Sequence, residues 1–194
     1  MKLVNLPKYG PLHRFADYHV YRVLRILSDR KRRGRKQLAV LVGVGEGSMR
    51  TILDWMREKG LVSVKQTGAR ITNTGLEFLS RLPIQVSDMR SSGISLGICN
   101  VAVLVRGRTE MVGSGIEQRD AAIKAGAEGA TTIVVSGGRL VVPTNYDLDK
   151  EDPDLASSIR DIFDLREGDV IIVGSAASRD TAEEGALAAA LDLL

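Results

Sequence analysis

Residues 35–59, with the sequence RKQLAVLVGVGEGSMRTILDWMREK, contain two apolar-periodic segments separated by Gly43-Val44-Gly45. In the second segment, four apolar residues from Met49 to Met56 follow the i, i+3, i+4, i+7 spacing of a helix that buries one face. Two short helices joined by a tight glycine turn are typical of a helix-turn-helix, whose second helix enters the DNA major groove. A helical hairpin in a purely structural bundle would show a similar pattern, so this stretch by itself leaves both interpretations open.

The neighbouring segments complete the order of a winged-helix domain. Residues 1–16 look like an extended arm, and helices are expected over 17–28, from Arg35, and over 46–59. Alternating strands then flank the glycine turn of a short hairpin, and a last helix ends before Pro83. The run GLVSVKQTGARITNTGLEFL resembles the wing of winged-helix regulators. We therefore predict an N-terminal winged helix-turn-helix domain.

Charge is distributed unevenly between the two halves of the chain. Residues 1–83 carry 17 Lys and Arg against 6 Asp and Glu, a net charge of +11, whereas residues 84–194 carry 10 against 18, a net charge of −8. A break of this size indicates two domains, of which the basic one faces a polyanion. We expect a DNA-binding domain over 1–83, a polar linker over 84–95, and a second domain over 96–194.

Several classes of protein are excluded by composition and motifs. A single cysteine, Cys99, rules out an intrachain disulfide and a multi-cysteine metal site. No apolar run reaches the roughly 18 residues of a membrane span, and the N-terminus lacks the apolar core of a signal peptide. No HExxH, Walker or G-x-S-x-G motif occurs, and His13 and His19 are expected to be surface or packing residues. We predict a cytoplasmic protein that is not an enzyme and that carries no metal or cofactor.

The third helix is the candidate recognition helix, with the face opposite its apolar stripe turned toward DNA. Arg can bond guanine with two hydrogen bonds, and Ser and Thr can reach bases or phosphates. The run from Arg30 to Lys36 holds six cations in seven residues between the first two helices, where it either lies over the phosphate backbone or is a solvated loop. With two cations of the hairpin, the predicted DNA-binding residues are Arg32, Arg33, Arg35, Lys36, Ser48, Arg50, Thr51, Lys65 and Arg70.

The second domain shows the order strand, helix, two strands, helix, strand and helix. Buried strands are expected over 96–105, 131–135, 139–142 and 170–173, with a last helix from Asp180. This β-α-β-β-α-β-α order is the split βαβ pattern of ferredoxin-like domains with one added helix. We predict an α+β protein whose second domain is a four-stranded sheet covered by helices on one face, with an open α/β sheet as the alternative.

A charged residue of this domain, Asp120, falls on a stripe shared with Ile116 and Ile123 that we expect to face the core. A charge on such a stripe requires a partner. It either pairs with Arg119 or Lys124 as a structural element, or it faces a pocket for a small-molecule effector. The pocket would be lined by Asn100, Arg106, Gln118, Arg119 and Asp120.

Two runs, GSGIEQRDAAIKAGAEGATTIVV and GDVIIVGSAASRDTAEEGALAAAL, are similar to an uncharacterised archaeal family. Its members join an N-terminal winged helix to a C-terminal α+β domain of unknown function and are described as transcriptional regulators. The resemblance covers nearly the whole chain and implies the same role here. It brings no ligand or catalytic residues with it.

These features favour a transcriptional regulator that binds double-stranded DNA through its winged helix. The C-terminal domain is expected to sense a metabolite or to form a homodimer, which would place two winged helices on half-sites one helical turn apart. Two alternatives stay open: an enzyme with a winged-helix appendage, and a protein-docking adaptor in chromatin or replication.

Overall fold

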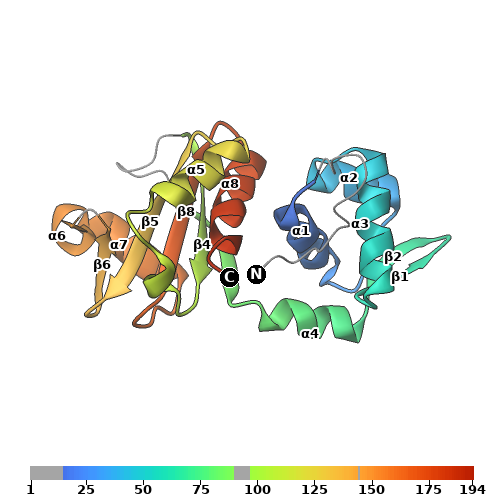
Figure 1. Cartoon of the computed structure of the whole chain (residues 1–194), viewed down its shortest axis with the longest axis horizontal. Helices are drawn as coiled ribbons and strands as arrows, with labels where there is room; N and C mark the ends of the chain where they lie inside the picture. Colours follow the sequence, from blue (N-terminus) through green and yellow to red (C-terminus); the bar gives the residue numbers. More distant parts are fainter. Residues whose placement is uncertain (1–14, 90–96, 144) are drawn as a thin grey trace. The chain divides into compact units, whose positions relative to one another are not determined.

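The computed structural model of the chain describes residues 15–89, 97–143 and 145–194 (Figure 1). The chain divides into two compact units, one ending at Leu82 and the other containing Pro83–Leu194. Most of the extended arm predicted for residues 1–16 lies outside the described residues, as do His13 and the end of the predicted linker. Within the described residues, no helix is long and apolar enough to cross a membrane.

The N-terminal unit has the predicted winged-helix order, so the α+β class with an N-terminal winged helix is confirmed. Three helices precede a two-stranded antiparallel hairpin, the wing, and a fourth helix follows it. The elements are α1 (Asp17–Leu27), α2 (Arg35–Val42), α3 (Glu46–Glu58), β1 (Val62–Lys65), β2 (Gly68–Ile71) and α4 (Asn73–Arg81).

The core of this unit is built from the apolar stripes of its first three helices. Burying each of these side chains stabilises the unit by about 1.5–3 kcal/mol. Gly43 ends α2 in the left-handed conformation, at φ 76°, which turns the chain sharply into α3. The fully buried side chains of the three helices are Val20, Val23, Leu24, Leu27, Leu38, Val42, Met49, Ile52 and Met56.

The wing is anchored to the segment that precedes α2. Arg33 forms an isolated β-bridge with Ala69, in which each backbone N–H donates to the other residue's carbonyl at 3.0 and 2.9 Å. Gly68 lies at φ +116°, and a Cβ built on it would be only 2.5 Å from the Arg33 carbonyl oxygen. This position therefore requires glycine, both for its backbone conformation and for the close approach of the two chains.

The C-terminal unit contains one six-stranded antiparallel sheet with strand order β3-β4-β8-β5-β6-β7. Its elements are β3 (Ile84–Met89), β4 (Cys99–Val105), the 3-10 turn η1 (Thr109–Met111), α5 (Ile116–Lys124), β5 (Gly129–Ser136), β6 (Arg139–Val142), β7 (Tyr146–Asp147), α6 (Leu148–Glu151), α7 (Pro153–Ile162), β8 (Val170–Ala176) and α8 (Arg179–Leu191).

Helices cover both faces of this sheet (Figure 1). On one face, α7 packs its Leu155, Ile159 and Phe163 against alternate side chains of β4, β5 and β8. On the other face lie α8 and α5. Gly174 of β8 is so close to α8 that an added Cβ would lie 2.4 Å from the Ala182 carbonyl oxygen. The alternation of side chains along β8 explains this, because Ile171 and Val173 point to the opposite face from Gly174.

The C-terminal unit keeps the predicted order of strands and helices but differs from the predicted four-stranded, ferredoxin-like sheet with helices on one face. It has two further edge strands, and its helices lie on both faces. The predicted linker over 84–95 is corrected as well, because its first six residues form β3 and pair with β4 from Ile84↔Val105 to Met89↔Asn100. The polar residues that suggested a linker belong to an edge strand with one solvated face.

Candidate nucleic-acid interface

The outward face of α3 is polar, as its periodicity predicts. Met49, Ile52 and Met56 are fully buried, whereas Arg50 is exposed and Ser48 and Thr51 are half-buried. A Cβ added to Gly47 would meet no atom within 4 Å, so there is open space beside this residue near the start of the helix. Among the described residues, the polar side of α3 is therefore at least partly accessible.

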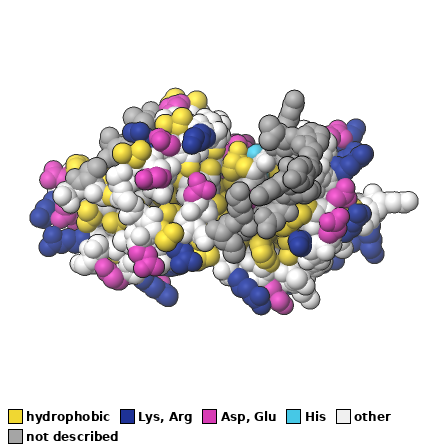
Figure 2. Space-filling model, viewed as in Figure 1, with side chains coloured by type: hydrophobic (Ala, Val, Ile, Leu, Met, Phe, Trp, Pro, Cys, Tyr) yellow, Lys and Arg dark blue, Asp and Glu magenta, His cyan; other side chains and the backbone are white. Residues whose placement is uncertain are grey.

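The predicted DNA-binding cations separate into two groups, and one group is unpaired. Lys36, Arg50, Lys65 and Arg70 are exposed, and they form no ion pair or side-chain hydrogen bond with the described part of the chain. They come from α2, α3 and the wing, and Figure 2 shows Lys and Arg side chains at this end of the N-terminal unit, interspersed with acidic ones. Charges without an internal partner remain available to a polyanion.

The other group stabilises the fold of the N-terminal unit. Arg33 donates to both carboxylate oxygens of Asp29 at 2.7 Å, and its side chain is only 18% exposed. These hydrogen bonds hold the pKa of the Asp29 carboxyl well below its usual range and raise the pKa of Arg33. Arg32 donates to the Gly68 carbonyl at 2.8 Å, and Arg35 pairs with Glu46 at 3.3 Å. Half of the basic run thus positions the wing and α3 rather than standing free in solution.

An ion pair on α3 accounts for Asp54, one of its three acidic residues. The Asp54 carboxylate lies 3.2 Å from the Arg57 guanidinium, with both side chains about half exposed. An acidic residue on a recognition helix either accepts from a cytosine or orients a neighbouring arginine, and Asp54 is paired with Arg57. Arg50 is left as the unpaired guanidinium of the α3 surface within the described residues.

A buried arginine of α1 lies against the end of α2 and was not predicted from the sequence. Arg22 is 4% exposed and donates to the carbonyls of Val42 and Leu41 at 3.3 and 3.4 Å, which otherwise lack partners at the end of a helix. Burial, with the nearby charge of Arg22, lowers the pKa of His19 to about 4, so its ring is neutral at pH 7. Arg22 lies on the side of α1 opposite the apolar stripe of Val20 and Leu24, so periodicity gave no signal of its burial.

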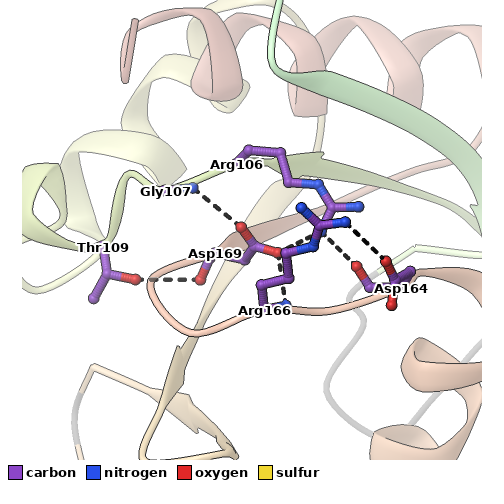
Figure 3. A network of polar contacts seen from close by, with 6 residues as sticks. All are labelled: Arg106, Gly107, Thr109, Asp164, Arg166 and Asp169. Carbon is purple, nitrogen blue, oxygen red and sulfur yellow. Dashed lines mark hydrogen bonds and ion pairs between the residues drawn. The ribbon is translucent and has the colours of Figure 1, made fainter.

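The predicted effector residues on β4 serve structural roles in separate places. Asn100 is buried and accepts a hydrogen bond from the Ser175 hydroxyl at 2.7 Å. At the other end of the strand, Arg106 donates to Asp169 at 2.6 Å. Asp169 is 2% exposed and also accepts from the backbone N–H groups of Gly107 and Arg166 at 3.1 and 2.9 Å (Figure 3). This network fastens the start of β8 to the end of β4.

The three effector residues predicted on α5 do not form a pocket with them. Gln118 is buried, whereas Arg119 and Asp120 are half exposed and pair with each other at 3.4 Å. The expectation that Asp120 lies on a core-facing stripe is wrong, because Ile116 and Ile123 on that stripe are 51% and 48% exposed. Ala122 and Gln118 face inward instead, because α5 packs closely on α8. An added Cβ on Gly185 of α8 would lie 3.4 Å from the Cβ of Ala122.

Comparison with protein families assigns both units. Residues 96–193 match the model of the family described as "Domain of unknown function (DUF4443)", over half of the chain. The chain belongs to the DUF4443 family. In this DUF4443 protein, residues 18–86 match a second model, described as "CggR N-terminal DNA binding domain". This match covers the winged helix and supports DNA binding by the N-terminal unit.

A solved structure resembles most of this DUF4443 protein. A hypothetical protein from Pyrococcus horikoshii OT3 superimposes with a TM-score of 0.69 at 29% sequence identity, and the alignment covers 90% of each chain. No curated protein matches the sequence. The similarity to an archaeal family with an N-terminal winged helix and a C-terminal domain of unknown function is confirmed.

Proposed function

We propose that this DUF4443 protein is a dimeric transcriptional regulator that reads duplex DNA with the outward face of α3. The observation that carries the proposal is the set of unpaired, exposed cations on α2, α3 and the wing. The family match of the N-terminal unit to a DNA-binding domain supports the same conclusion. In this proposal, α3 lies in the major groove and the wing lies over the adjacent backbone.

Each unpaired cation has a role that its position suggests. Arg50 projects from α3 and donates two hydrogen bonds to a guanine, with Ser48 and Thr51 beside it contacting bases or phosphates. Lys65 and Arg70 of the wing and Lys36 of α2 neutralise phosphates, which contributes affinity and salt dependence but no sequence preference. Arg32, Arg33 and Arg35 act indirectly, by holding the wing and α3 in place.

Selection from random duplexes tests the proposal. The full-length protein should enrich a defined sequence motif, and a pseudo-palindromic motif is expected for a two-fold dimer. Arg50→Ala should lower the enrichment at one position of each half-site, while Arg57→Ala, on the same helix but paired with Asp54, should leave the motif unchanged. Failure of the full-length protein to enrich any motif would favour a protein-docking adaptor over a regulator.

A small-molecule effector is a second candidate role for the C-terminal unit, and one observation favours it. A cavity of about 340 Å³ lies between the β5–β6 hairpin and the end of α7, with Val135, Leu140 and Phe163 among its apolar residues and Arg160 and Arg166 among its polar ones. The lining also includes Asp164 and Glu167, which balance the two arginines, so it suits a small zwitterionic metabolite with an apolar part. Thermal unfolding in the presence of amino acids tests this role, and a rise in midpoint that Arg166→Ala removes would support it.

A further inference from the structure

The helix α5 has its apolar and polar faces reversed. Its two large apolar residues, Ile116 and Ile123, are 51% and 48% exposed, whereas Gln118 is 5% exposed. The Gln118 Oε1 atom is buried without a hydrogen-bond partner in the described residues, as is the hydroxyl of Thr132 on β5. Exposed isoleucines and a buried amide oxygen without a partner both cost stability in an isolated domain.

Close packing between helices explains why α5 presents its small side to α8. Ala122 is fully buried, and a Cβ added to Gly185 of α8 would lie 3.4 Å from the Ala122 Cβ. Isoleucine at the inner positions would not fit this spacing. The larger side chains are consequently directed outward, where Met111, five residues before Ile116, is a further exposed apolar residue. Figure 2 shows hydrophobic side chains exposed over this part of the C-terminal unit, with charged ones beside them.

The charges beside the apolar stripe are arranged for self-recognition. Successive residues of a helix are about 100° apart, so Arg119 and Asp120 lie on opposite flanks of the line that joins Ile116 and Ile123. Their side chains are 52% and 50% exposed. When two parallel α5 helices pack about a two-fold axis, the flank that carries Arg119 in one copy faces the flank that carries Asp120 in the other. Arg119 of each copy then lies against Asp120 of the other copy. An antiparallel pair would bring like charges together.

We infer that the outward face of α5 is the surface through which two copies of this chain associate, with their α5 helices parallel. The isoleucines of the two copies meet along the two-fold axis, and two Arg119–Asp120 ion pairs flank them. The near-neutral charge of this face makes it unsuitable for DNA, and its apolar stripe fits a protein surface. This inference rests on the proposal that the regulator is a dimer.

Sedimentation velocity of the full-length protein at micromolar concentration tests the apolar stripe. We expect a dimer for the wild type, and the double variant Ile116→Lys/Ile123→Lys should raise the dissociation constant at least about 100-fold. Both residues are exposed, so the variant should keep the wild-type circular dichroism spectrum. Val40→Lys is the matched control, because Val40 is 82% exposed on α2 and should leave the dimer intact.

Charge reversal tests the parallel geometry. Arg119→Asp and Asp120→Arg should each weaken the homodimer, and an equal mixture of the two variants should form a heterodimer. The double variant Arg119→Asp/Asp120→Arg should dimerise with itself but not with the wild type. Free exchange of that double variant with the wild type would overturn the parallel arrangement.

The remaining outcomes separate this inference from the proposed function. A wild-type dimer that persists in the Ile116→Lys/Ile123→Lys variant overturns the α5 interface and leaves the regulator proposal standing. A wild-type monomer that still binds duplex DNA overturns both the interface and the dimer. A dimer that binds no duplex DNA overturns the proposed function alone.

Discussion

The helices α3 and α5 have outward faces of opposite character. On α3 the large apolar residues Ile52 and Met56 are buried and Arg50 is exposed, whereas on α5 Ile116 and Ile123 are exposed and Gln118 is buried. The first arrangement satisfies the core and leaves unpaired charge for a polyanion. The second leaves apolar surface exposed, which is typical of a surface that binds a partner. The exposed side chains of a helix thus indicate what the helix binds better than its helix propensity or its length does.

We expect DNA binding by α3 to depend most on Arg50. Its replacement by alanine should weaken specific DNA binding by about 1–3 kcal/mol, roughly 5- to 160-fold, because a bidentate contact to guanine is lost. Fluorescence anisotropy with a selected duplex measures this. Arg57→Ala serves as the control because Arg57 is already paired with Asp54, and an equal loss in both variants would contradict a specific role for Arg50.

Acid should destabilise the N-terminal unit more than the C-terminal unit, because only the N-terminal unit contains a buried histidine. The pKa of His19 is about 4 when folded against an ordinary value of 6.5. As the pH falls, the unfolded chain therefore takes up this proton before the folded chain does. The stability of the N-terminal unit keeps its full value above pH 6.5 and is lost progressively between pH 6.5 and 4. At pH 5 the loss should reach about 2 kcal/mol.

Calorimetry at pH 7.5 and pH 5 measures this loss as a lower midpoint for the N-terminal transition. Residues 83–194 contain no histidine, so the C-terminal transition should shift less over the same interval. His19→Gln should reduce the pH dependence of the N-terminal transition. Unchanged pH dependence in that variant would show that another group is responsible.

The wing cations should contribute affinity that depends on salt rather than on sequence. Each phosphate contact contributes about 0.9 to the slope of log K against log salt concentration, so Lys65→Ala/Arg70→Ala should make that slope shallower by about 1.8. The preferred motif should stay the same. Lys150→Ala, in the acidic C-terminal unit, is expected to leave the slope unchanged, and a matching change there would argue against a local contact.

The smallest effect is expected beneath α5, where the hydroxyl of Thr132 is buried without a hydrogen-bond partner among the described residues. Thr132→Val removes that hydroxyl and keeps the shape of the side chain, so the C-terminal unit should be equally stable or more stable by up to about 1 kcal/mol. Urea unfolding measures the change. A clear loss of stability would mean that the hydroxyl is hydrogen-bonded, which would weaken the case for a reversed α5.

Periodicity allowed the winged helix to be predicted but misled us about α5. The stripe of α3 follows the helical repeat and is buried, and the glycine turns at Gly43 and Gly68 fall where the sequence placed them. The stripe of α5 follows the same repeat and is exposed, because close packing on Gly185 selects alanine inward. A single sequence does not show which neighbour a helix meets, and this explains why Asp120 was assigned to the core.

The partners of the charged residues could not be predicted from the sequence either, because they depend on how the chain folds. Within the predicted DNA-binding set, the sequence did not distinguish Arg33, which pairs with Asp29, from Lys36, which has no ion-pair partner among the described residues. It also gave no indication that Arg106 is engaged by Asp169, 63 residues away in the chain. The segment that forms β3 was predicted to be a linker because it contains polar residues. In the structure these residues belong to an edge strand, where polar side chains on the solvated face are expected as well.

Binding of the wild-type protein to duplex DNA across a series of salt concentrations tests the central claim most directly. Contacts from Lys36, Lys65 and Arg70 to phosphates predict that log K falls linearly with log salt concentration, with a slope of about −3 or steeper. The same titration with Arg50→Ala should keep the slope and lose affinity. A binding constant independent of salt, or no binding at low salt, would contradict an α3 surface built to contact DNA.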